Sequence, residues 1–401
     1  MFEKSVRYYH ALKSLFLLAS RLIYRTADRD IPEFDLAKRE NFMTHLTDTQ
    51  LKQERETKFP SFSIVYETEN LQSVELENIY RSLFSLAAQD ISPTQANEFL
   101  IIDSGDAPPE VIEQLCSMYP WITVRRVPGI GYHEAKMMGA TLVTGEIIVL
   151  CDSDCVYEPN WLRNILTTFL DNSDINVVGG ETSTPVRNPY ELAIAIHYFF
   201  PRFSGLEHPY ESQHYFLNGV AFRRDFLLQH PIPGNLPIYR GNCVLHIYSL
   251  CNLQGYKIWR HPQARATHEP PTMSFAFWRY LLMGHDSVVR ERLKLILTDT
   301  QDTADDSKLS PELGRTPYQR IRSRAGKAWW ELKQLKKKKI ISVLREDPRR
   351  LILLPLAVPI ILWFQLLFNI GRVITYFQPD LLLKQYKEIE TKPSESASSA
   401  T

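Results

Sequence analysis

The sequence predicts an α/β fold, with a mostly parallel sheet flanked by helices and a C-terminal helical region that associates with a membrane. Three observations favour this class. Short apolar runs alternate with segments of helical periodicity between residues 62 and 150, as in strands joined by helical crossovers. Two aspartates, Asp152 and Asp154, directly follow the last of these runs. Residues 351–368 form an almost uninterrupted apolar segment behind a basic block.

Four strands and three helices are expected to alternate in the first part of the fold. The expected strands are 62–66, 99–102, 122–127 and 147–150, and the expected helices are 75–88, 109–118 and 134–143. Ligands of such sheets bind at the carboxyl ends of the strands. Polar residues that directly follow a strand are therefore the candidates for chemistry.

Composition divides the rest of the chain into segments. Residues 1–58 carry a basic amphipathic helix, which either lies on a membrane surface or packs on the domain, and a polar linker. The α/β domain is expected at 59–290. The remaining segments are a mobile loop (291–317), a basic juxtamembrane helix (318–350), a membrane-embedded segment (351–377) and a polar tail (378–401).

The apolar segment is long enough to enter a membrane. Its stretch 351–368 contains one polar side chain, Gln365, and a helix of this length covers roughly 27 Å, close to a hydrocarbon core of about 30 Å. A buried core helix is the alternative, which Pro355 and Pro359 favour. Arginines bracket the segment at Arg349, Arg350 and Arg372.

Charge is balanced overall but uneven locally. The chain has 46 Lys and Arg against 46 Asp and Glu. A net charge of zero argues against electrostatic binding of nucleic acid by the chain as a whole, so no nucleic-acid partner is expected. Residues 315–350 carry thirteen basic and three acidic residues. Beside an apolar segment, such a block favours anionic membrane lipids. The positive-inside rule then keeps the α/β domain in the cytoplasm.

The cysteine pattern indicates reduced thiols. The chain has five cysteines and no C-x-x-C pair, which does not suit a disulfide framework. Cys151 and Cys155 have the spacing of half a zinc site, but no His/Cys pair at metal spacing completes it. A zinc site is therefore not expected from the sequence.

The strongest candidates for chemistry are Asp152 and Asp154, one residue apart at the end of the strand 147–150. Carboxylates are the ligands that hard divalent cations prefer, and such cations keep positions for water or substrate phosphate. The cation then offsets the charge of a nucleotide diphosphate. The alternative for an isolated D-x-D sequence is a solvated turn.

Other polar residues are expected on the same edge of the sheet. Glu67, Glu69 and Asn70 follow the first strand, and Asp103 follows the second. A glycine-containing loop precedes a basic residue that can reach a diphosphate; its members are Gly129, Gly131, Lys136 and Gly139. Each residue alone has a structural alternative as a turn former, loop residue or surface charge, and their common order favours function.

Residues 60–285 resemble the catalytic domain of glycosyltransferase family 2, which has the GT-A fold. The segments that carry the resemblance are 62–70, 101–105, 136–139, 145–154, 218–224 and 255–268. The closest match is 145–154, which is similar to the metal-binding signature of the family. In the first segment Glu67 stands where the family usually has proline.

The resemblance implies a role for each matching residue. Donor binding is implied for Glu67, Glu69, Asn70, Asp103, Lys136, Gly139, Asp152 and Ser153. Metal binding is implied for Asp154, with Asp152 supporting it and His268 completing the site. The acceptor side is implied for Asn218 and Gly219. From their own chemistry, Arg240 and Asn242 are candidates for binding acceptor or diphosphate.

One departure from the family concerns the general base. The family usually has a Glu-Asp pair shortly before Gly255, whereas this chain has no acidic residue between Asp225 and Glu269. His246 lies on the segment that replaces the pair, and its ordinary pKa suits base work near neutrality. The alternative is a structural helix histidine. The competing candidates are Glu181, Glu207, Glu211 and Glu269.

The resemblance implies an enzyme that transfers a sugar from a UDP- or GDP-linked donor, with Mn²⁺ or Mg²⁺ as cofactor and inversion at the anomeric carbon. The acceptor would be a glycan, a lipid-linked or another hydroxyl compound at the cytoplasmic membrane face, in polysaccharide or glycoconjugate synthesis. Two alternatives stay open. The missing acidic pair favours a non-catalytic nucleotide-sugar binder, and a nucleotidyltransferase would share the sheet, although its glycine-rich phosphate loop is absent near the start of the chain.

Overall fold

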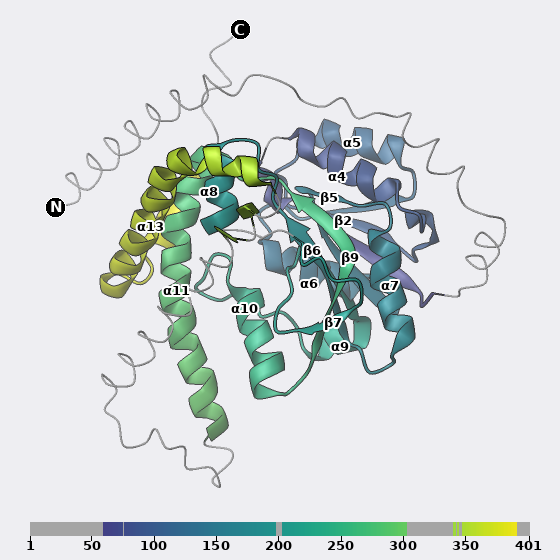
Figure 1. The fold of residues 1–401 in the computed structure, drawn as a ribbon. Coiled ribbons are helices and arrows are strands. Elements are labelled where there is room, and N and C mark those ends of the chain that lie inside the picture. The colour runs from purple at the N-terminus through teal and green to yellow at the C-terminus, as the bar shows by residue number, and fades with distance from the viewer. Residues whose placement is uncertain are drawn as a thin grey trace. The chain divides into compact units, whose positions relative to one another are not determined.

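The computed structural model describes residues 59–74, 76–197, 203–302, 340–341, 343–344 and 347–390. The chain separates into two units, Met1–Phe59 and Pro60–Thr401. Apart from Phe59, the first unit and its predicted amphipathic helix lie outside the described residues. In the second unit, helices flank a nine-stranded sheet (Figure 1).

The first half of the sheet is parallel, as predicted. Its strands pair in the order β3-β2-β1-β4, and their bounds are β1 (Phe62–Glu67), β2 (Phe99–Asp103), β3 (Ile122–Arg126) and β4 (Ile147–Asp152). Between them lie the helices α4 (Glu77–Ala87), α5 (Pro109–Met118) and α6 (Tyr132–Leu142), with short 3₁₀ turns at η1 (Glu69–Ser73) and η2 (Pro93–Gln95). Every residue of β1, β2 and β4 is buried, which explains their continuous apolar runs.

The second half of the sheet combines parallel and antiparallel pairs, so the sheet as a whole is mixed. Its strands are β5 (Cys155–Tyr157), β6 (Val177–Ser183), β7 (Tyr210–Ser212), β8 (Gly219–Arg223) and β9 (Ile258–His268). Strand β8 runs antiparallel between β4 and β6, whereas β9 is parallel to β6 and antiparallel to β5 and β7. Apolar periodicity reveals a strand but not its direction, so the prediction of a mostly parallel sheet holds only for the first half.

Helices also fill the connections of the second half. They are α7 (Trp161–Asp171), α8 (Pro189–His197), α9 (Arg224–Gln229), α10 (Asn242–Ile247) and the π-helical turn η3 (Tyr248–Leu253). Helix α10 begins within the segment that replaces the acidic pair of the family. Trp161, at the start of α7, is fully buried against Tyr157 of β5, so the chain beyond Asp154 is anchored directly in the core.

A C-terminal group of helices packs on this domain. It consists of α11 (Met273–Asp302), the 3₁₀ turn η5 (Pro348–Ile352), α13 (Leu354–Phe377) and α14 (Leu381–Glu390). Helix α13 lies along α11 and α8 (Figure 1). Two predicted boundaries differ from this arrangement: position 290 falls inside α11, and α14 occupies part of the predicted polar tail. Residues 303–339, which include the predicted loop end and most of the basic helix, lie outside the described residues.

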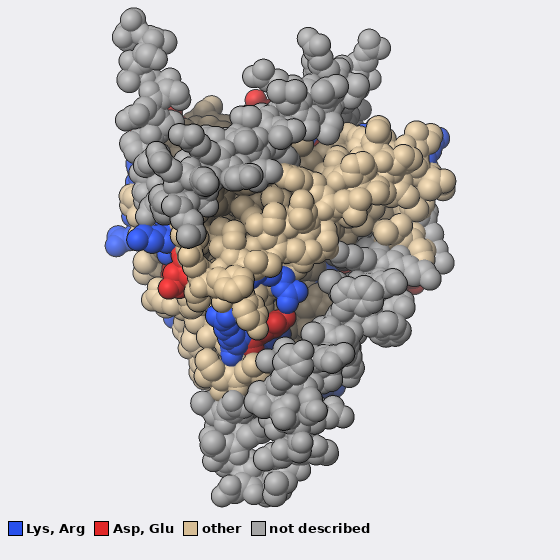
Figure 2. All heavy atoms as spheres, turned by 90° about the vertical axis from the view of Figure 1, so that its left-hand side faces the viewer, with Lys and Arg blue, Asp and Glu red and all other residues tan. Residues whose placement is uncertain are grey.

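Helix α13 has one packed face and one exposed face. Its buried side chains are Ala357, Phe364, Leu367, Gly371 and Thr375, and Phe364 stacks on Tyr280 of α11 with ring centroids 4.0 Å apart. Large apolar side chains elsewhere on the helix are exposed: Leu356, Val358, Leu362, Leu366, Val373, Tyr376 and Phe377. On the side of the molecule where α13 lies, Figure 2 shows a broad area without charged side chains, with Lys, Arg, Asp and Glu gathered beside it.

Among the described residues, α13 is the one helix long and apolar enough to cross a membrane, and 22% of its most apolar window is buried. A core helix of a soluble protein would be mostly buried. The exposed apolar face therefore argues against the alternative of a core helix. Membrane insertion of 351–377 stays a prediction.

Candidate functional site

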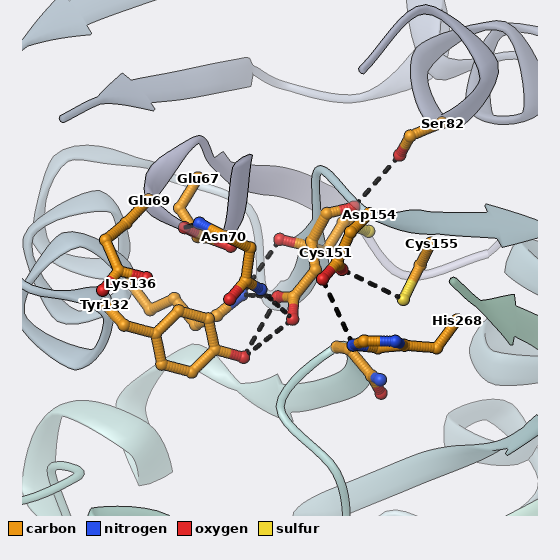
Figure 3. Close-up of polar contacts among 12 residues, drawn as sticks. Glu67, Glu69, Asn70, Ser82, Tyr132, Lys136, Cys151, Asp154, Cys155 and His268 are labelled. Carbon is orange, nitrogen blue, oxygen red and sulfur yellow. Dashed lines mark hydrogen bonds and ion pairs between the residues drawn. The ribbon is translucent and has the colours of Figure 1, made fainter. Parts of the chain in front are cut away.

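Polar side chains at the ends of β1 and β4 meet at one edge of the parallel half of the sheet (Figure 3). Glu67 ends β1 and Asp152 ends β4, and the parallel register places these two residues side by side. Both carboxylates are buried. Two adjacent buried carboxylates cannot both stay charged without cationic or hydrogen-bonding partners. The surrounding residues supply those partners mainly to Asp152.

Asp152 accepts hydrogen bonds from three side chains. The donors are Lys136 Nζ at 2.5 Å, Asn70 Nδ2 at 2.7 Å and Tyr132 Oη at 2.8 Å. Lys136 is fully buried and also donates to the carbonyl of Cys151 at 2.9 Å. Lys136 therefore neutralises Asp152 and fixes its orientation. A direct contact with a diphosphate would need the ammonium group at the surface, whereas here it is buried.

Glu67 has a different environment. Burial raises the pKa of its carboxyl well above the usual range, and the charge of Asp152 raises it further. One oxygen accepts a hydrogen bond from the backbone N–H of Asn70 at 3.3 Å, and Oε1 has no hydrogen-bond partner among the described residues. A neutral carboxylic acid here can donate its proton to a bound ligand.

Arg240 brings a second cation to this edge. Its guanidinium forms an ion pair with Glu69 and lies 3.9 Å from the centroid of the Tyr132 ring. The side chain is 10% exposed. The segment that replaces the acidic pair of the family thus supplies a buried positive charge. Tyr132 connects this cation to Asp152, since its ring contacts Arg240 and its hydroxyl donates to Asp152.

Asp154 and His268 form the part of the site that suits a metal ion. His268 Nε2 lies 3.2 Å from Asp154 Oδ2, while His268 Nδ1 lies 2.6 Å from the carbonyl oxygen of Glu269. A carbonyl oxygen only accepts, so Nδ1 carries a proton, and Nε2 is the ring nitrogen that faces the carboxylate. A cation placed between His268 Nε2 and Asp154 Oδ2 would bind both atoms.

The environment of Asp154 supports this reading. Burial raises the pKa of Asp154 to about 6, although nearby His268 lowers it in part, and Oδ2 receives no hydrogen bond among the described residues. The Sγ atom of Cys155 lies 3.6 Å from Asp154 Oδ1. Ligand atoms of Asp154, Cys155 and His268 all lie within 4.8 Å of one another. The residues present therefore fit a divalent cation.

The remaining predicted donor residues, Asp103, Ser153 and Gly139, are all buried. Asp103 Oδ1 accepts from Gly105 N at 2.9 Å and Thr68 Oγ1 at 3.2 Å, and Arg126 lies 3.4 Å from its second oxygen. Ser153 is buried without a hydrogen-bond partner for its hydroxyl among the described residues. Gly139 allows α6 to approach β1, because a Cβ there would overlap Val65.

The predicted acceptor residues lie in two places. Asn218, before β8, accepts from Thr182 Oγ1 at 3.2 Å, and Gly219 lies against Trp161 in the core. Asn242 begins α10 beyond Arg240 and donates to the carbonyl of Pro233 at 2.5 Å. We call Asp152 and its three donors, Lys136, Asn70 and Tyr132, the Asp152 cluster. Of the four predicted acceptor residues, Arg240 is the one whose side chain is shown to contact this cluster, through the Tyr132 ring.

The contacts of His246 favour its structural alternative. Its Nδ1 lies 2.6 Å from the hydroxyl of Tyr215 and its Nε2 lies 2.8 Å from the carbonyl oxygen of His230. Burial lowers the pKa of His246 to about 4. Both ring nitrogens are engaged inside the fold, so this geometry supports the structural alternative and argues against a general base.

Three of the four competing glutamates also have structural partners. Glu181 accepts from Ser204 N at 2.7 Å and Tyr210 Oη at 2.9 Å. Glu269 pairs with Arg81 and Arg187. Glu211 pairs with Lys257 near the surface, and Glu207 is exposed. None of these contacts reaches the Asp152 cluster.

The sequence did not predict the positions of Tyr132 and Cys155 in the site, nor the ion pair between Glu69 and Arg240. A signal for Tyr132 was present, since it lies four residues before Lys136 and positions i and i+4 share a helix face. The pair of Glu69 and Arg240 spans 171 residues, and no local pattern predicts such a contact.

Comparison with known proteins agrees with the resemblance. Residues 74–240 match the family described as Glycosyl transferase family 2. Over 110 residues the chain is 29% identical to the glucosyl-dolichyl phosphate glucuronosyltransferase of Haloferax volcanii, which covers 25% of this chain. The chain spans 33% of the length of that relative.

Similar solved structures include GalNAc-T7 with UDP, GalNAc and Mn²⁺, which has 15% identity and a TM-score of 0.41 over 54% of this chain and 45% of its own. They also include the mannosyltransferase PcManGT from Pyrobaculum calidifontis in complex with GDP-Man and Mn²⁺. It has 14% identity and a TM-score of 0.41 over 75% of this chain and 94% of its own.

Proposed function

Since residues 74–240 carry a domain of glycosyl transferase family 2, we propose that this protein transfers a sugar from a UDP- or GDP-linked donor to a hydroxyl acceptor. The observation that carries the proposal is the pair of Asp154 and His268, 3.2 Å apart and buried at the strand edge. A carboxylate and an imidazole aimed at one point suit a divalent cation.

The residues of the site have two different roles, metal binding and the positioning of Asp152. Asp154 and His268 would hold the cation, which supplies charge neutralisation for the leaving diphosphate. Lys136, Tyr132 and Asn70 hold Asp152 in one orientation through the hydrogen bonds described above. Preorganised polar groups of this kind stabilise charge that develops in the transition state without further reorganisation.

Arg240 and Glu67 are the groups that would contact substrate next to the cation. The guanidinium of Arg240 is fixed by Glu69 and the Tyr132 ring, so it adds positive charge on the side of Asp152. Glu67 offers an oxygen that no described residue occupies. We assign both to the recognition of the donor, because Glu67 lies beside Asp152 and Arg240 lies over the ring of Tyr132, which holds Asp152.

Metal-dependent donor binding tests the proposal. In thermal-shift titrations with UDP- and GDP-sugars, Mn²⁺ should raise the unfolding temperature further when the donor is present. Asp154→Ala should abolish this coupling, and the matched change at exposed Asp174 should leave it intact. If Mn²⁺ still strengthens donor binding in the Asp154 variant as it does in the wild type, the assignment is contradicted.

The missing acidic pair favours one alternative, a nucleotide-sugar binder without catalysis. Radiolabelled donors incubated with glycan and lipid-linked acceptors separate the two functions. Sugar transfer supports the enzyme, whereas metal-dependent donor binding without transfer to any acceptor, water included, supports the binder.

We further propose that α13 attaches the protein to the cytoplasmic face of a membrane, where its acceptor for polysaccharide or glycoconjugate synthesis would lie. The support is the exposed apolar face of α13 beside Arg349 and Arg350. Replacing Leu356, Leu362 and Leu366 by Ser should reduce sedimentation with anionic vesicles. Exposed Leu142 and Leu170 of the sheet domain provide the matched control. Equal vesicle binding of both variants would contradict the attachment site.

A further inference from the structure

We propose that Cys155 is a third protein ligand of the cation, so that Asp154, Cys155 and His268 form a site that prefers Zn²⁺ to Mg²⁺. The role of this site in transfer rests on the proposed function, whereas the metal set itself rests on geometry. Figure 3 shows the three side chains converging, with Asp154 between the thiol and the imidazole.

Strand pairing brings the thiol and the imidazole together. Cys155 begins β5 and His268 ends β9, and the antiparallel register places their Cα atoms directly opposite each other. Directly opposed residues point to the same face of a sheet. The ligand atoms of both residues and of Asp154 lie within 4.8 Å of one another, a spacing that one cation with bonds of about 2.0–2.3 Å can bridge after small side-chain rotations.

The surroundings favour a ligand role over simple packing. Cys155 is fully buried and contacts a charged group, because its Sγ lies 3.6 Å from Asp154 Oδ1. The bond from His268 Nδ1 to the Glu269 carbonyl fixes which ring nitrogen faces Asp154. Histidine ligands of metals are commonly oriented by such a bond. A cation at this point would take the thiolate as ligand, and the thiol proton would pass to solvent.

Donor chemistry then decides the metal. Mg²⁺ demands oxygen ligands in octahedral geometry, whereas a thiolate and an imidazole suit Zn²⁺ and its analogue Cd²⁺. Three protein ligands leave a fourth position for water or a diphosphate oxygen, as in catalytic zinc sites. The site is assembled by pairing β5 with β9, which explains why the spacing of Cys151 and Cys155 alone did not predict it.

X-ray absorption at the zinc edge tests the proposal on the full chain loaded with one equivalent of Zn²⁺. We expect one sulfur neighbour at about 2.3 Å together with nitrogen and oxygen neighbours at about 2.0–2.2 Å. Cys155→Ser should remove the sulfur signal and weaken Zn²⁺ binding roughly tenfold or more. Cys151→Ser, equally buried on β4, should keep the sulfur signal.

A Cd²⁺ titration gives an independent readout through the thiolate-to-metal charge-transfer absorption. We expect this band in the wild type, and its loss in both Cys155→Ser and His268→Ala. A second variant, Cys155→Ala, covers the case in which the serine variant does not fold.

The outcomes separate this inference from the proposed function. Zinc bound without sulfur, or a sulfur signal that persists in both Cys155 variants, overturns the Cys155 ligand and leaves sugar transfer untouched. Sulfur-ligated zinc in a protein that transfers no sugar supports the metal set and counts against the proposed function. Absence of any bound cation in the wild type overturns the Cys155 ligand together with the metal dependence.

Discussion

The carboxylate of Asp286 accepts a hydrogen bond from the backbone N–H of Arg240 at 2.8 Å. Its other oxygen accepts one from the backbone N–H of Tyr239, also at 2.8 Å. Asp286 is buried on α11, where His285 Nδ1 lies 3.0 Å from it. A residue of the C-terminal helices thus fixes the backbone from which Arg240 reaches Glu69.

The first prediction concerns this positioning. Asp286→Ala leaves two backbone N–H groups without an acceptor and should lower the free energy of unfolding by about 2–4 kcal/mol, measured by denaturant titration. Asp225, whose side chain is 88% exposed, gives the matched control, and Asp225→Ala should change stability little. At a temperature where both variants are folded, the Asp286 variant should also raise the KM for donor. Unchanged stability and KM would contradict the role of Asp286.

A second prediction concerns the buried pair of Lys136 and Asp152. Lys136→Met leaves the Asp152 carboxylate buried without its cation, and breaking such a pair costs about 3–5 kcal/mol. Because each single change leaves a buried charge, the double variant Lys136→Met/Asp152→Leu should cost less than the sum of the two single changes. Denaturant titration of the four proteins measures this coupling.

The more exposed pair of Arg163 and Asp90 is the control for that cycle. Its two side chains are 25% and 27% exposed, so Arg163→Met should cost no more than about 1 kcal/mol. Equal costs at Lys136 and Arg163 would show that burial does not strengthen the Lys136 pair.

A third prediction follows from the lowered pKa of His246, about 4 in the folded protein against about 6.5 when unfolded. Between these values the unfolded chain binds a proton that the folded chain does not, so the stabilising effect is complete above pH 6.5 and falls as the pH drops toward 4. His246→Gln should reduce the loss of stability across this window by up to about 3 kcal/mol, as followed by denaturant titration at several pH values. The same change at exposed His208 is the control.

The rate of sugar transfer by a His246 variant distinguishes a structural residue from a general base. If the residue is structural, sugar transfer by His246→Gln should stay within about tenfold of the wild type at pH 8. A general base would cost about a hundredfold or more. A loss of that size in a variant of normal stability would restore His246 as the base.

The first four strands and Asp152-Ser153-Asp154 were predictable because their signals are local. Continuous apolar runs mark buried parallel strands, and polar residues directly after them fall on one edge of the sheet. The direction of β8 and β9 was not predictable in this way, because it depends on connections that apolar periodicity does not report. The mixed sheet is the result.

The contacts within the site depend on the same long-range topology. Asn70 reaches Asp152 across 82 residues, and Asp286 reaches Arg240 across 46. Lys136 lies on the predicted edge of the sheet, and its contact with Asp152 makes it an internal cation. His246 had the right chemistry and the right segment, but α10 turns it toward Tyr215 and the core.

The last prediction concerns the contact between α11 and α13, on which the position of Asp286 depends. Gly371 of α13 lies against the carbonyl group of Leu281, and Gly284 of α11 lies against the carbonyl oxygen of Phe368; a Cβ at either glycine would overlap these atoms. Gly371→Val should therefore separate the helices and destabilise the protein by about 1–3 kcal/mol or more. Val373→Ala, at a position 57% exposed on the same helix, should have little effect. Since α11 carries Asp286, the Gly371 variant should also raise the KM for donor, measured at a temperature where it is folded. If thermal unfolding and KM match those of the Val373 variant, the packing of α13 is independent of the site, and the C-terminal helices serve for attachment alone.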